Sequence, residues 1–279
     1  MAHFYERIKN RVVKYEEEIS KLTNMLYNND SSFFMESFVK IIDNGCFKTM
    51  KLCGNYLSFE SMLSDVYGID IISDRFICLS ELILSLNEQI LFSQVAGLAE
   101  RSFVKSQLSG MKNLILYDLE KLNLSVEIIE DDIGRVASIG PKNALLEEVL
   151  ENVTDRNIET MLIKYNSSLN NGDVNTKENI LCAIYSYVES YLKNPQLLAL
   201  NKRLFGNVDF LYNNLNMKHD NKVYNETFFY EETLSEREKW LDNLYHLVLM
   251  VIASKKENDT NQSINELKVK KKNDSATSD

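Results

Sequence analysis

Glycine and proline are scarce in this 279-residue chain, which contains nine of the first and two of the second. Both residues interrupt helices and form tight turns, so their scarcity argues against a sheet of many short strands. The residues that abound instead, Leu, Glu, Lys, Asn and Ile, favour long helices with few turns. The composition therefore predicts a mainly α protein, and a hydrophobic content of 44% supplies material for a large core.

Cysteine is also rare, and its four copies follow no spacing typical of a zinc site or of a thioredoxin-type pair. Most of them lie in or beside apolar runs, so we expect reduced, buried thiols at Cys46, Cys53, Cys78 and Cys182. Residues 1–122 contain no catalytic spacing, no glycine-rich phosphate loop and no paired-histidine helix. We therefore expect no metal and no cofactor.

Positive charge is in deficit, because 31 Lys and Arg face 41 Asp and Glu and leave a formal net charge of −10. A surface for general nucleic-acid binding needs clustered cations, so only a local RNA site fits this balance. Long apolar runs are missing too: the N-terminus lacks a signal-peptide core, and no run reaches membrane-spanning length. We expect a cytoplasmic protein without membrane contact.

Changes in residue composition and apolar periodicity divide the chain into four parts. Residues 1–123 carry helical periodicity and predict an N-terminal helical domain. Residues 124–140 hold two β-type runs around an acidic turn and predict a hairpin junction, which must lean on a helical layer because isolated hairpins are marginally stable. Residues 141–255 return to helical spacing as a second helical domain. Residues 256–279 are so polar that we expect a disordered tail.

Helices are predicted within these parts from apolar spacing and caps. In the first domain they are expected at 4–28, 31–45, 59–67, from 73 through the apolar run that ends at 84, at 88–108 and at 111–122. In the second domain two are expected at 142–152 and 155–168, the latter capped by Thr154 or Asp155.

The stretch from Asn170 to Ala253 organises the second domain. Its first helix has Thr176 as a plausible N-cap, and its second opens with a capping box of Thr233 and Glu236. Each helix has an apolar stripe that needs a partner, made of Ile180, Ile184, Tyr187, Val188 and Tyr191 in the first and Leu241, Leu244, Tyr245, Val248 and Ile252 in the second. We expect the two helices to cover one another, with the polar segment 212–222 between them.

Three histidines limit the search for a general base. His3 lies at the terminus, and His246 falls off the apolar stripe of its helix, as expected of an exposed surface residue. His219 lies beside Lys218 and near Lys222, and an imidazole among cations and amides can take a proton from a ribose 2′-hydroxyl while charge on a phosphate is stabilised. The alternative is a polar loop that contains one histidine.

From residue 124 onward the order of these signals resembles the C-terminal half of bacterial abortive-infection proteins of the AbiJ type, whose last domain is a HEPN-like helical bundle. The resemblance covers roughly 130 residues and is carried by the hairpin, the final apolar helix and the segments 168–173, 183–193 and 218–221. It implies antiparallel helices that often form a homodimer. In many members it also implies metal-independent RNA cleavage by an arginine followed, after a short gap, by a histidine.

Carried over onto this chain, the resemblance assigns His219 to the catalytic histidine. The polar neighbours are Asn213, Asn214 and Asn216. No arginine stands at the motif position, and the nearest cations are Lys218 and Lys222. A lysine lacks the guanidinium fork that matches a phosphate, so it is not equivalent to the motif arginine.

Two further residues are candidates in a supporting role. Arg203 is too far along the chain to count as the motif arginine, although folding or a second protomer could bring it near. Glu189 matches a position that is usually acidic in the family, and it lies opposite the apolar stripe of its helix, where it faces either solvent or a second contact surface.

Two functional hypotheses follow. The first is a phage-resistance protein that acts by abortive infection and cleaves RNA at a dimeric HEPN-like site. The second is a catalytically inactive helical module that binds a phage or host protein, which the missing arginine and the acidic charge favour. An unrelated helical structural protein remains a third reading.

Overall fold

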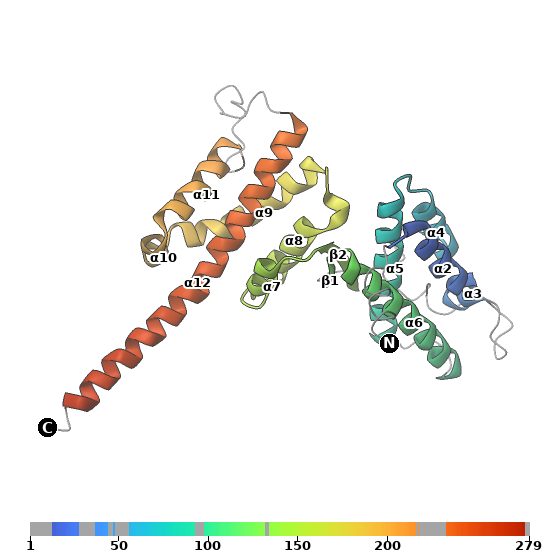
Figure 1. The fold of residues 1–279 in the computed structure, drawn as a ribbon, viewed down its shortest axis with the longest axis horizontal. Helices are drawn as coiled ribbons and strands as arrows, with labels where there is room; N and C mark the ends of the chain where they lie inside the picture. The colour runs from blue at the N-terminus through green and yellow to red at the C-terminus, as the bar shows by residue number, and fades with distance from the viewer. Residues whose placement is uncertain are drawn as a thin grey trace, which may run out of the picture. The chain divides into compact units, whose positions relative to one another are not determined.

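The computed structural model describes residues 13–27, 37–43, 47, 56–92, 98–131, 134–215, 217 and 233–276 (Figure 1). In these ranges the chain is mainly helical with one small antiparallel sheet, as predicted. It divides into two compact units, the first made of Met1–Lys142 with Asn166–Leu169 and the second of Asn143–Tyr165 with Asn170–Asp279. None of the described helices is long and apolar enough to cross a membrane.

The first unit is built around one buried helix. Its helices are α2 (Tyr15–Tyr27), α3 (Phe38–Ile41), α4 (Phe59–Tyr67), α5 (Ile72–Phe92) and α6 (Leu98–Lys121). α5 contacts α2, α4 and α6, so the apolar run is central to this unit, as predicted. α4 has the predicted bounds and opens with a capping box of Ser58 and Ser61. α3 is capped by Ser37, while the expected caps at positions 31 and 32 lie outside the described residues.

One prediction for this unit is wrong. The sequence predicts separate helices at 88–108 and 111–122, but α5 continues to Phe92 and a single helix, α6, runs from Leu98 to Lys121. Gly110 lies inside α6, and its neighbours Leu108 and Met111 are fully buried. Burial on both sides of the glycine outweighs its low helix propensity, because tertiary packing supplies most helical stability in proteins.

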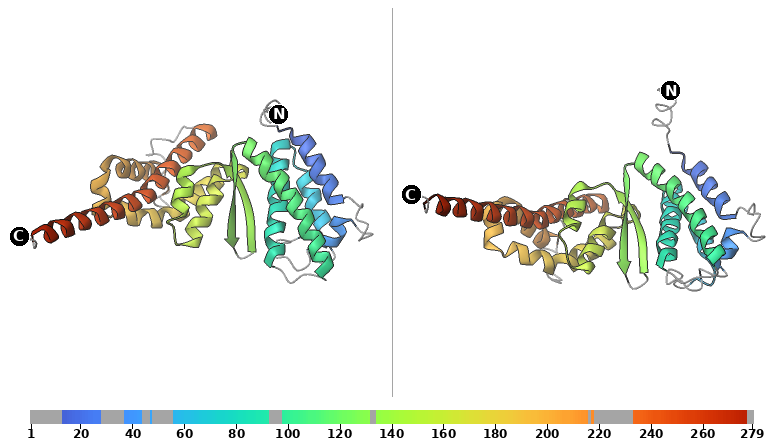
Figure 2. Two further views of the ribbon diagram at one scale, coloured as in Figure 1. Left: turned by 60° about the horizontal axis from the view of Figure 1, so that its bottom comes forward. Right: turned by 90° about the horizontal axis from the view of Figure 1, so that it is seen from below.

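The predicted hairpin is present and belongs to the first unit. β1 (Leu124–Asp131) pairs with β2 (Gly134–Pro141) in antiparallel register, with Val126 opposite Ile139 and Ile128 opposite Ala137. β2 packs along α5, as Figure 2 shows, and this provides the helical layer that a lone hairpin needs.

The edge of β2 that does not face β1 is bound by side chains of α5. The Ile139 N–H donates to Glu81 Oε1 at 2.6 Å, and the Ala137 N–H donates to Ser85 Oγ at 2.8 Å. Gln89 Nε2 donates to the carbonyl oxygen of β2 residue 135 at 3.4 Å. Side chains spaced four residues apart on α5 thus form hydrogen bonds with backbone groups spaced two residues apart on β2. Three polar backbone groups of this edge thus have partners without a third strand.

The second unit is a helical bundle. Its elements are α7 (Ala144–Leu150), α8 (Arg156–Asn166), a 3₁₀ turn (Ser168–Asn170), α9 (Val174–Leu192), α10 (Pro195–Leu200), α11 (Lys202–Asn214) and α12 (Leu234–Ala276). α12 contacts α7, α9, α10 and α11, so it is the common partner of the bundle. The predicted apolar stripe of α12 is buried throughout.

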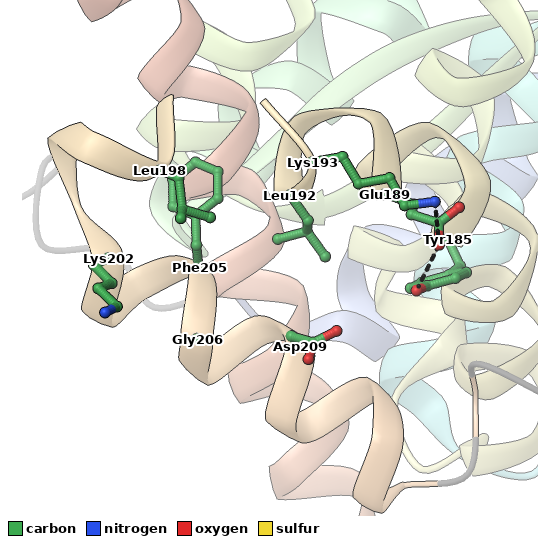
Figure 3. Close-up of a pocket in the computed structure, with 9 residues that line it drawn as sticks. All are labelled: Tyr185, Glu189, Leu192, Lys193, Leu198, Lys202, Phe205, Gly206 and Asp209. Carbon is green, nitrogen blue, oxygen red and sulfur yellow. Dashed lines mark hydrogen bonds and ion pairs between the residues drawn. The ribbon is translucent and has the colours of Figure 1, made fainter. Parts of the chain in front are cut away.

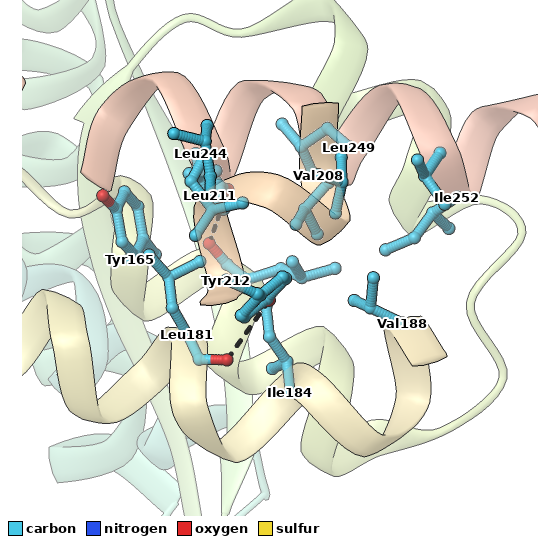
Figure 4. Packing of buried hydrophobic residues seen from close by; sticks show 14 of the residues in the cluster. Tyr165, Leu181, Ile184, Val188, Val208, Leu211, Tyr212, Leu244, Leu249 and Ile252 are labelled. Atoms are coloured by element: carbon cyan, nitrogen blue, oxygen red, sulfur yellow. Dashed lines mark hydrogen bonds between the residues drawn. The ribbon is translucent and has the colours of Figure 1, made fainter. Parts of the chain in front are cut away.

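The core of this unit lies between α9, α11 and α12 (Figure 4). Tyr212 of α11 is fully buried there, and its hydroxyl donates to the Leu181 carbonyl oxygen of α9 at 3.3 Å. On the expected stripe of α9, Ile184, Val188 and Tyr191 are buried. The prediction that the two long helices cover one another is confirmed by their contact.

The helix starts in this unit follow from side-chain caps. Asp155 caps α8, since its carboxylate accepts the N–H groups of the second and third residues of the helix, at 2.9 and 3.4 Å. The capping box of Thr233 and Glu236 is confirmed. The predicted cap Thr176 is wrong: Asp173 caps α9, and Thr176 donates both its N–H and its hydroxyl to that carboxylate. An aspartate is favoured here because the helix dipole attracts its charge.

Two further predictions for the second unit are corrected. Helices α10 and α11 occupy residues 195–200 and 202–214, so Tyr212 and the two residues after it end α11 rather than begin an irregular segment. The expected disordered tail is instead a continuation of α12 to Ala276, which extends past the other helices of its unit (Figures 1 and 2). α12 contains neither glycine nor proline, and its first half is already held by the core, so continuation needs no new nucleus.

Candidate functional site

Half of the eight predicted site residues lie in the described part of the chain. His219, Asn216, Lys218 and Lys222 lie outside the described residues. The described ones are Asn213, Asn214, Glu189 and Arg203, which occur on α9 and α11.

Asn213 and Asn214 form the last turn of α11. Asn213 Nδ2 donates to Asp209 Oδ2 at 3.2 Å, and Asn214 Nδ2 donates to the Phe210 carbonyl oxygen at 2.7 Å. Both amides are therefore held against the end of the helix, at the point where the chain leaves it for the segment that carries His219.

An arginine that the sequence analysis missed lies at the same end. Arg237, in the first turn of α12, donates from its guanidinium to the Leu215 carbonyl oxygen at 3.2 Å and forms an ion pair with Glu178 of α9. Leu215 is four residues before His219 in the chain. No motif could have revealed this arginine, because it follows the histidine in sequence and is brought back by the packing of α12.

A buried lysine lies one residue from Glu178. Lys177 Nζ is 2.8 Å from Glu238 Oε1 and 2.8 Å from Asp242 Oδ1, and its side chain is 5% exposed. Burial lowers the pKa of Lys177, but the hydrogen bonds to Asp242 and Glu238 outweigh it, so the net pKa lies above its ordinary value. The lysine is therefore charged at neutral pH and cannot act as a general base.

Two neighbours complete this cluster. The Tyr165 hydroxyl donates to Asp242 Oδ1 at 3.0 Å, and the Gly172 N–H donates to Glu238 Oε1 at 2.6 Å. Burial, followed by the charge of Asp242, raises the pKa of Tyr165, so its hydroxyl keeps its proton. The cluster ties the start of α9 to the start of α12 and is a structural clamp.

Among the described ion-paired residues of this cluster and of Arg237, the charge balance is slightly negative. The cations Lys177 and Arg237 face the three carboxylates Glu178, Glu238 and Asp242. A phosphate that approaches Arg237 has to compete with Glu178 for the guanidinium.

Arg203 is not part of this constellation. It lies in the first turn of α11, ten residues before Asn213 on the same helix. Ten residues of α-helix span roughly 15 Å, so the fold of one chain keeps Arg203 away from the end where the asparagines lie.

Glu189 lines a cavity between α9, α10 and α11 with a volume of about 380 Å³ (Figure 3). Its carboxylate accepts from the Tyr185 hydroxyl at 3.3 Å and pairs with Lys193 Nζ at 3.1 Å. The Glu189 side chain is 34% exposed, so it is partly open to solvent in this cavity. The rest of the lining is apolar or charged: Leu192, Leu198, Lys202, Phe205, Gly206 and Asp209.

A second cavity, also of about 380 Å³, lies between α11 and α12. It is lined by Asn207, Phe210, Leu211, Trp240, Asn243, His246 and Leu247. His246 is exposed, as the sequence predicts.

The cysteines are free where the structure describes them. Cys78 is half-buried, and its burial raises the thiol pKa to about 11. Cys182 is exposed, so the prediction of a buried thiol is wrong there, because position 182 faces away from the stripe that α9 buries. The other two cysteines lie outside the described residues. Among the residues with described placement, no group of three His, Cys, Asp or Glu side chains is arranged to hold a metal ion.

Comparison with models of known protein families, with curated proteins and with solved structures finds no match for this chain.

Proposed function

We propose that this protein confers phage resistance by abortive infection, and that its second unit cleaves RNA without a metal. The observation that supports this proposal is the contact of the Arg237 guanidinium with the carbonyl oxygen of Leu215, which precedes His219 by four residues in the sequence. It supplies the kind of cation that the family motif requires and that the sequence alone lacks next to the histidine. By resemblance, the site is shared by a homodimer.

The chemistry divides between a base and a phosphate clamp. The His219 imidazole takes the proton of a ribose 2′-hydroxyl, whose oxygen attacks the adjacent phosphorus. The bond to the 5′-oxygen breaks, and that oxygen takes up a proton, so the products are a 2′,3′-cyclic phosphate and a 5′-hydroxyl. The planar guanidinium of Arg237 stabilises the charge that develops on the phosphate, in exchange for its pairing with Glu178.

The test is RNA integrity in bacteria after induced expression. Wild type should degrade RNA and arrest growth, and His219→Ala should do neither. Arg237→Lys keeps the charge but loses the fork, so it should retain only a small part of the activity. Arg156→Ala, which removes an exposed arginine from the start of α8, is the matched control and should behave as wild type. Growth arrest with intact RNA in all four strains would contradict the proposed nuclease activity.

A second candidate is favoured by the charges at the same end of the bundle. Among the ion-paired residues described there, carboxylates outnumber cations by three to two, which disfavours a phosphate and suits a protein surface that carries lysine or arginine. In this case the unit is a helical module that binds a phage or host protein. Growth arrest that survives His219→Ala but is lost when Glu178 and Arg237 are both replaced by alanine would support it.

A further inference from the structure

The cavity between α11 and α12 carries chemistry that the proposed cleavage does not use. Phe210 is 51% exposed, which is a large exposed fraction for a phenylalanine, and Trp240 lines the facing wall. The polar part of the lining consists of the amides of Asn207 and Asn243 and the imidazole of His246. None of the described lining residues is a carboxylate, although the chain carries 41 of them.

Helical spacing explains why these residues share one groove. Asn207 and Phe210 are three residues apart on α11, and Asn243 and His246 are three apart on α12, so each pair lies on one face of its helix. The two helices are in contact, which brings the faces together. The side chains of Asn207, Asn243 and His246 make no hydrogen bond or ion pair in the described structure, so their donors and acceptors remain available to a ligand.

We infer that this groove binds a nucleobase, with its ring stacked on Phe210 and its edge hydrogen-bonded by Asn207 and Asn243. A planar aromatic heterocycle matches an aromatic platform, and amides offer both a donor and an acceptor, as base edges do. The inference rests on the proposed function, because it names the part of the substrate that the same unit holds.

The polar lining favours a base over an apolar side chain of a partner protein. An aliphatic group that covered the groove would strip water from two amides and an imidazole without replacing their hydrogen bonds, which costs free energy. A base replaces those bonds. The volume of about 380 Å³ is in the range of small-ligand sites.

The groove also leads toward the end of α11. Phe210 accepts the Asn214 amide on its carbonyl oxygen, so the stacking residue lies one helical turn from the last residue of the helix. A base on Phe210 is therefore held close to the end of α11, and His219 follows that end by five residues in the sequence. The base could belong to an RNA strand or to a free nucleotide, and the two sources are separated below.

The experiment uses Trp240, the single tryptophan of the chain, as the reporter. Full-length His219→Ala is titrated with AMP, GMP, CMP or UMP, with a single-stranded RNA of about ten nucleotides, and with ribose 5-phosphate, which has no base. Tryptophan emission, corrected for absorption by the probe, should be quenched by the first two classes and not by ribose 5-phosphate. Quenching by RNA but not by mononucleotides identifies a strand as the source, and the reverse identifies free nucleotides.

Variants test the assignment of the platform. Phe210→Ala should weaken binding roughly tenfold, because a stacked base loses its partner. Phe210→Tyr keeps a ring and should bind within about twofold of the parent. Tyr117→Ala removes an exposed aromatic residue from α6 and is the matched control, with no expected change. Circular dichroism of each variant confirms that the fold is intact.

The outcomes separate this inference from the proposed function. No quenching by any probe, or equal affinity of Phe210→Ala in a folded protein, overturns the inference and leaves a protein partner as the occupant of the groove. If bases bind but no RNA is degraded in cells, the proposed nuclease activity is contradicted and the groove is supported as a nucleotide-binding site. If RNA degradation needs His219 but is unchanged by Phe210→Ala, the proposed nuclease activity is supported and base binding in the groove is contradicted.

Discussion

Glu81 combines an ionisable group with a partly buried position against β2. Burial raises the pKa of its carboxyl group from 4.5 to about 7, although the hydrogen bond from the Ile139 N–H opposes this shift. Between these two values the folded state binds the proton more tightly than the unfolded state. The stabilisation from Glu81 is therefore complete below about pH 4.5 and is lost as the pH rises through about 7.

Glu81→Gln should remove this dependence. The amide keeps an oxygen for the Ile139 N–H but carries no charge, so the variant should exceed wild type in free energy of unfolding at pH 8, by at most about 3 kcal/mol, and match it at about pH 4. Urea unfolding followed by circular dichroism at both pH values gives the difference. Glu147→Gln, at an exposed position of α7, is the control. A difference that is the same at both pH values would contradict this account.

Two glycines should respond in opposite directions to alanine. At Gly206, inside α11, an added Cβ meets no atom within 4 Å, so Gly206→Ala should stabilise the second unit by about 0.5 to 1 kcal/mol through helix propensity. At Gly140 a Cβ would overlap the backbone oxygen of Asn166, so Gly140→Ala should destabilise by about 2 kcal/mol or more. Thermal unfolding followed by Trp240 fluorescence measures the change in Tm for Gly206→Ala. Thermal unfolding followed by circular dichroism measures it for Gly140→Ala. A lower Tm for Gly206→Ala would mean that the open space is needed for packing.

At the scale of elements, the contact between the starts of α9 and α12 depends on Lys177. Lys177→Met should cost about 2 kcal/mol, because it leaves Glu238 and Asp242 without their cation. This value is below that of a fully buried pair, since the Asp242 side chain is 51% exposed. Lys193→Met removes a 72% exposed lysine from the same helix and should cost less than about 0.5 kcal/mol. Urea unfolding by Trp240 fluorescence compares them, and equal losses would argue against the clamp.

The second half of α12 should contribute helix without contributing stability. Described side chains from Ser263 to Val269 are exposed. Removal of residues 262–279 should therefore reduce the far-UV circular dichroism per molecule but change the free energy of unfolding by less than about 0.5 kcal/mol. A larger loss of stability would show that this extension packs against a surface, for instance that of a second copy.

Elements with strong local signals are the ones that the sequence predicts. The hairpin has alternating β-type runs, and α9 and α12 have long apolar stripes, so each follows from residues close together in the chain. The predictions include no helix between 193 and 211, although Leu204, Val208 and Leu211 have helical spacing and are buried in α11. The extension of α12 was also missed, because polarity predicts disorder while continuity with a buried half favours a helix.

The candidate site was less predictable than the fold. Arg237 reaches Leu215 only because α12 packs against α9 and α11, and no spacing along the chain encodes that contact. The same packing creates the groove of Phe210 and Trp240. From its own helix alone, His246 is predicted only as an exposed surface residue, because its neighbours in the groove on α11 are distant in sequence.

At the scale of the whole molecule, the net charge of −10 bears on how RNA would bind. A protein that holds RNA through many phosphate contacts loses affinity steeply with salt. Here the described lining of the groove has neither lysine nor arginine, so affinity for a short RNA should fall by less than about tenfold between about 50 and 200 mM NaCl. Fluorescence titration at the two salt concentrations measures this, and a fall of about 1,000-fold would point to a phosphate surface elsewhere.

The pairing of α5 with β2 limits how long the hairpin arm can be. Four residues of α-helix advance about 6.0 Å and two residues of antiparallel strand about 6.8 Å, so the two repeats drift apart by roughly 0.8 Å at each step. The hydrogen bonds lengthen in that direction, from 2.6 Å at Glu81 to 2.8 Å at Ser85 and 3.4 Å at Gln89. A fourth hydrogen bond in this series would exceed hydrogen-bonding distance. A related protein with a longer hairpin would therefore need a β-bulge, or another segment that binds the additional backbone N–H and C=O groups of β2.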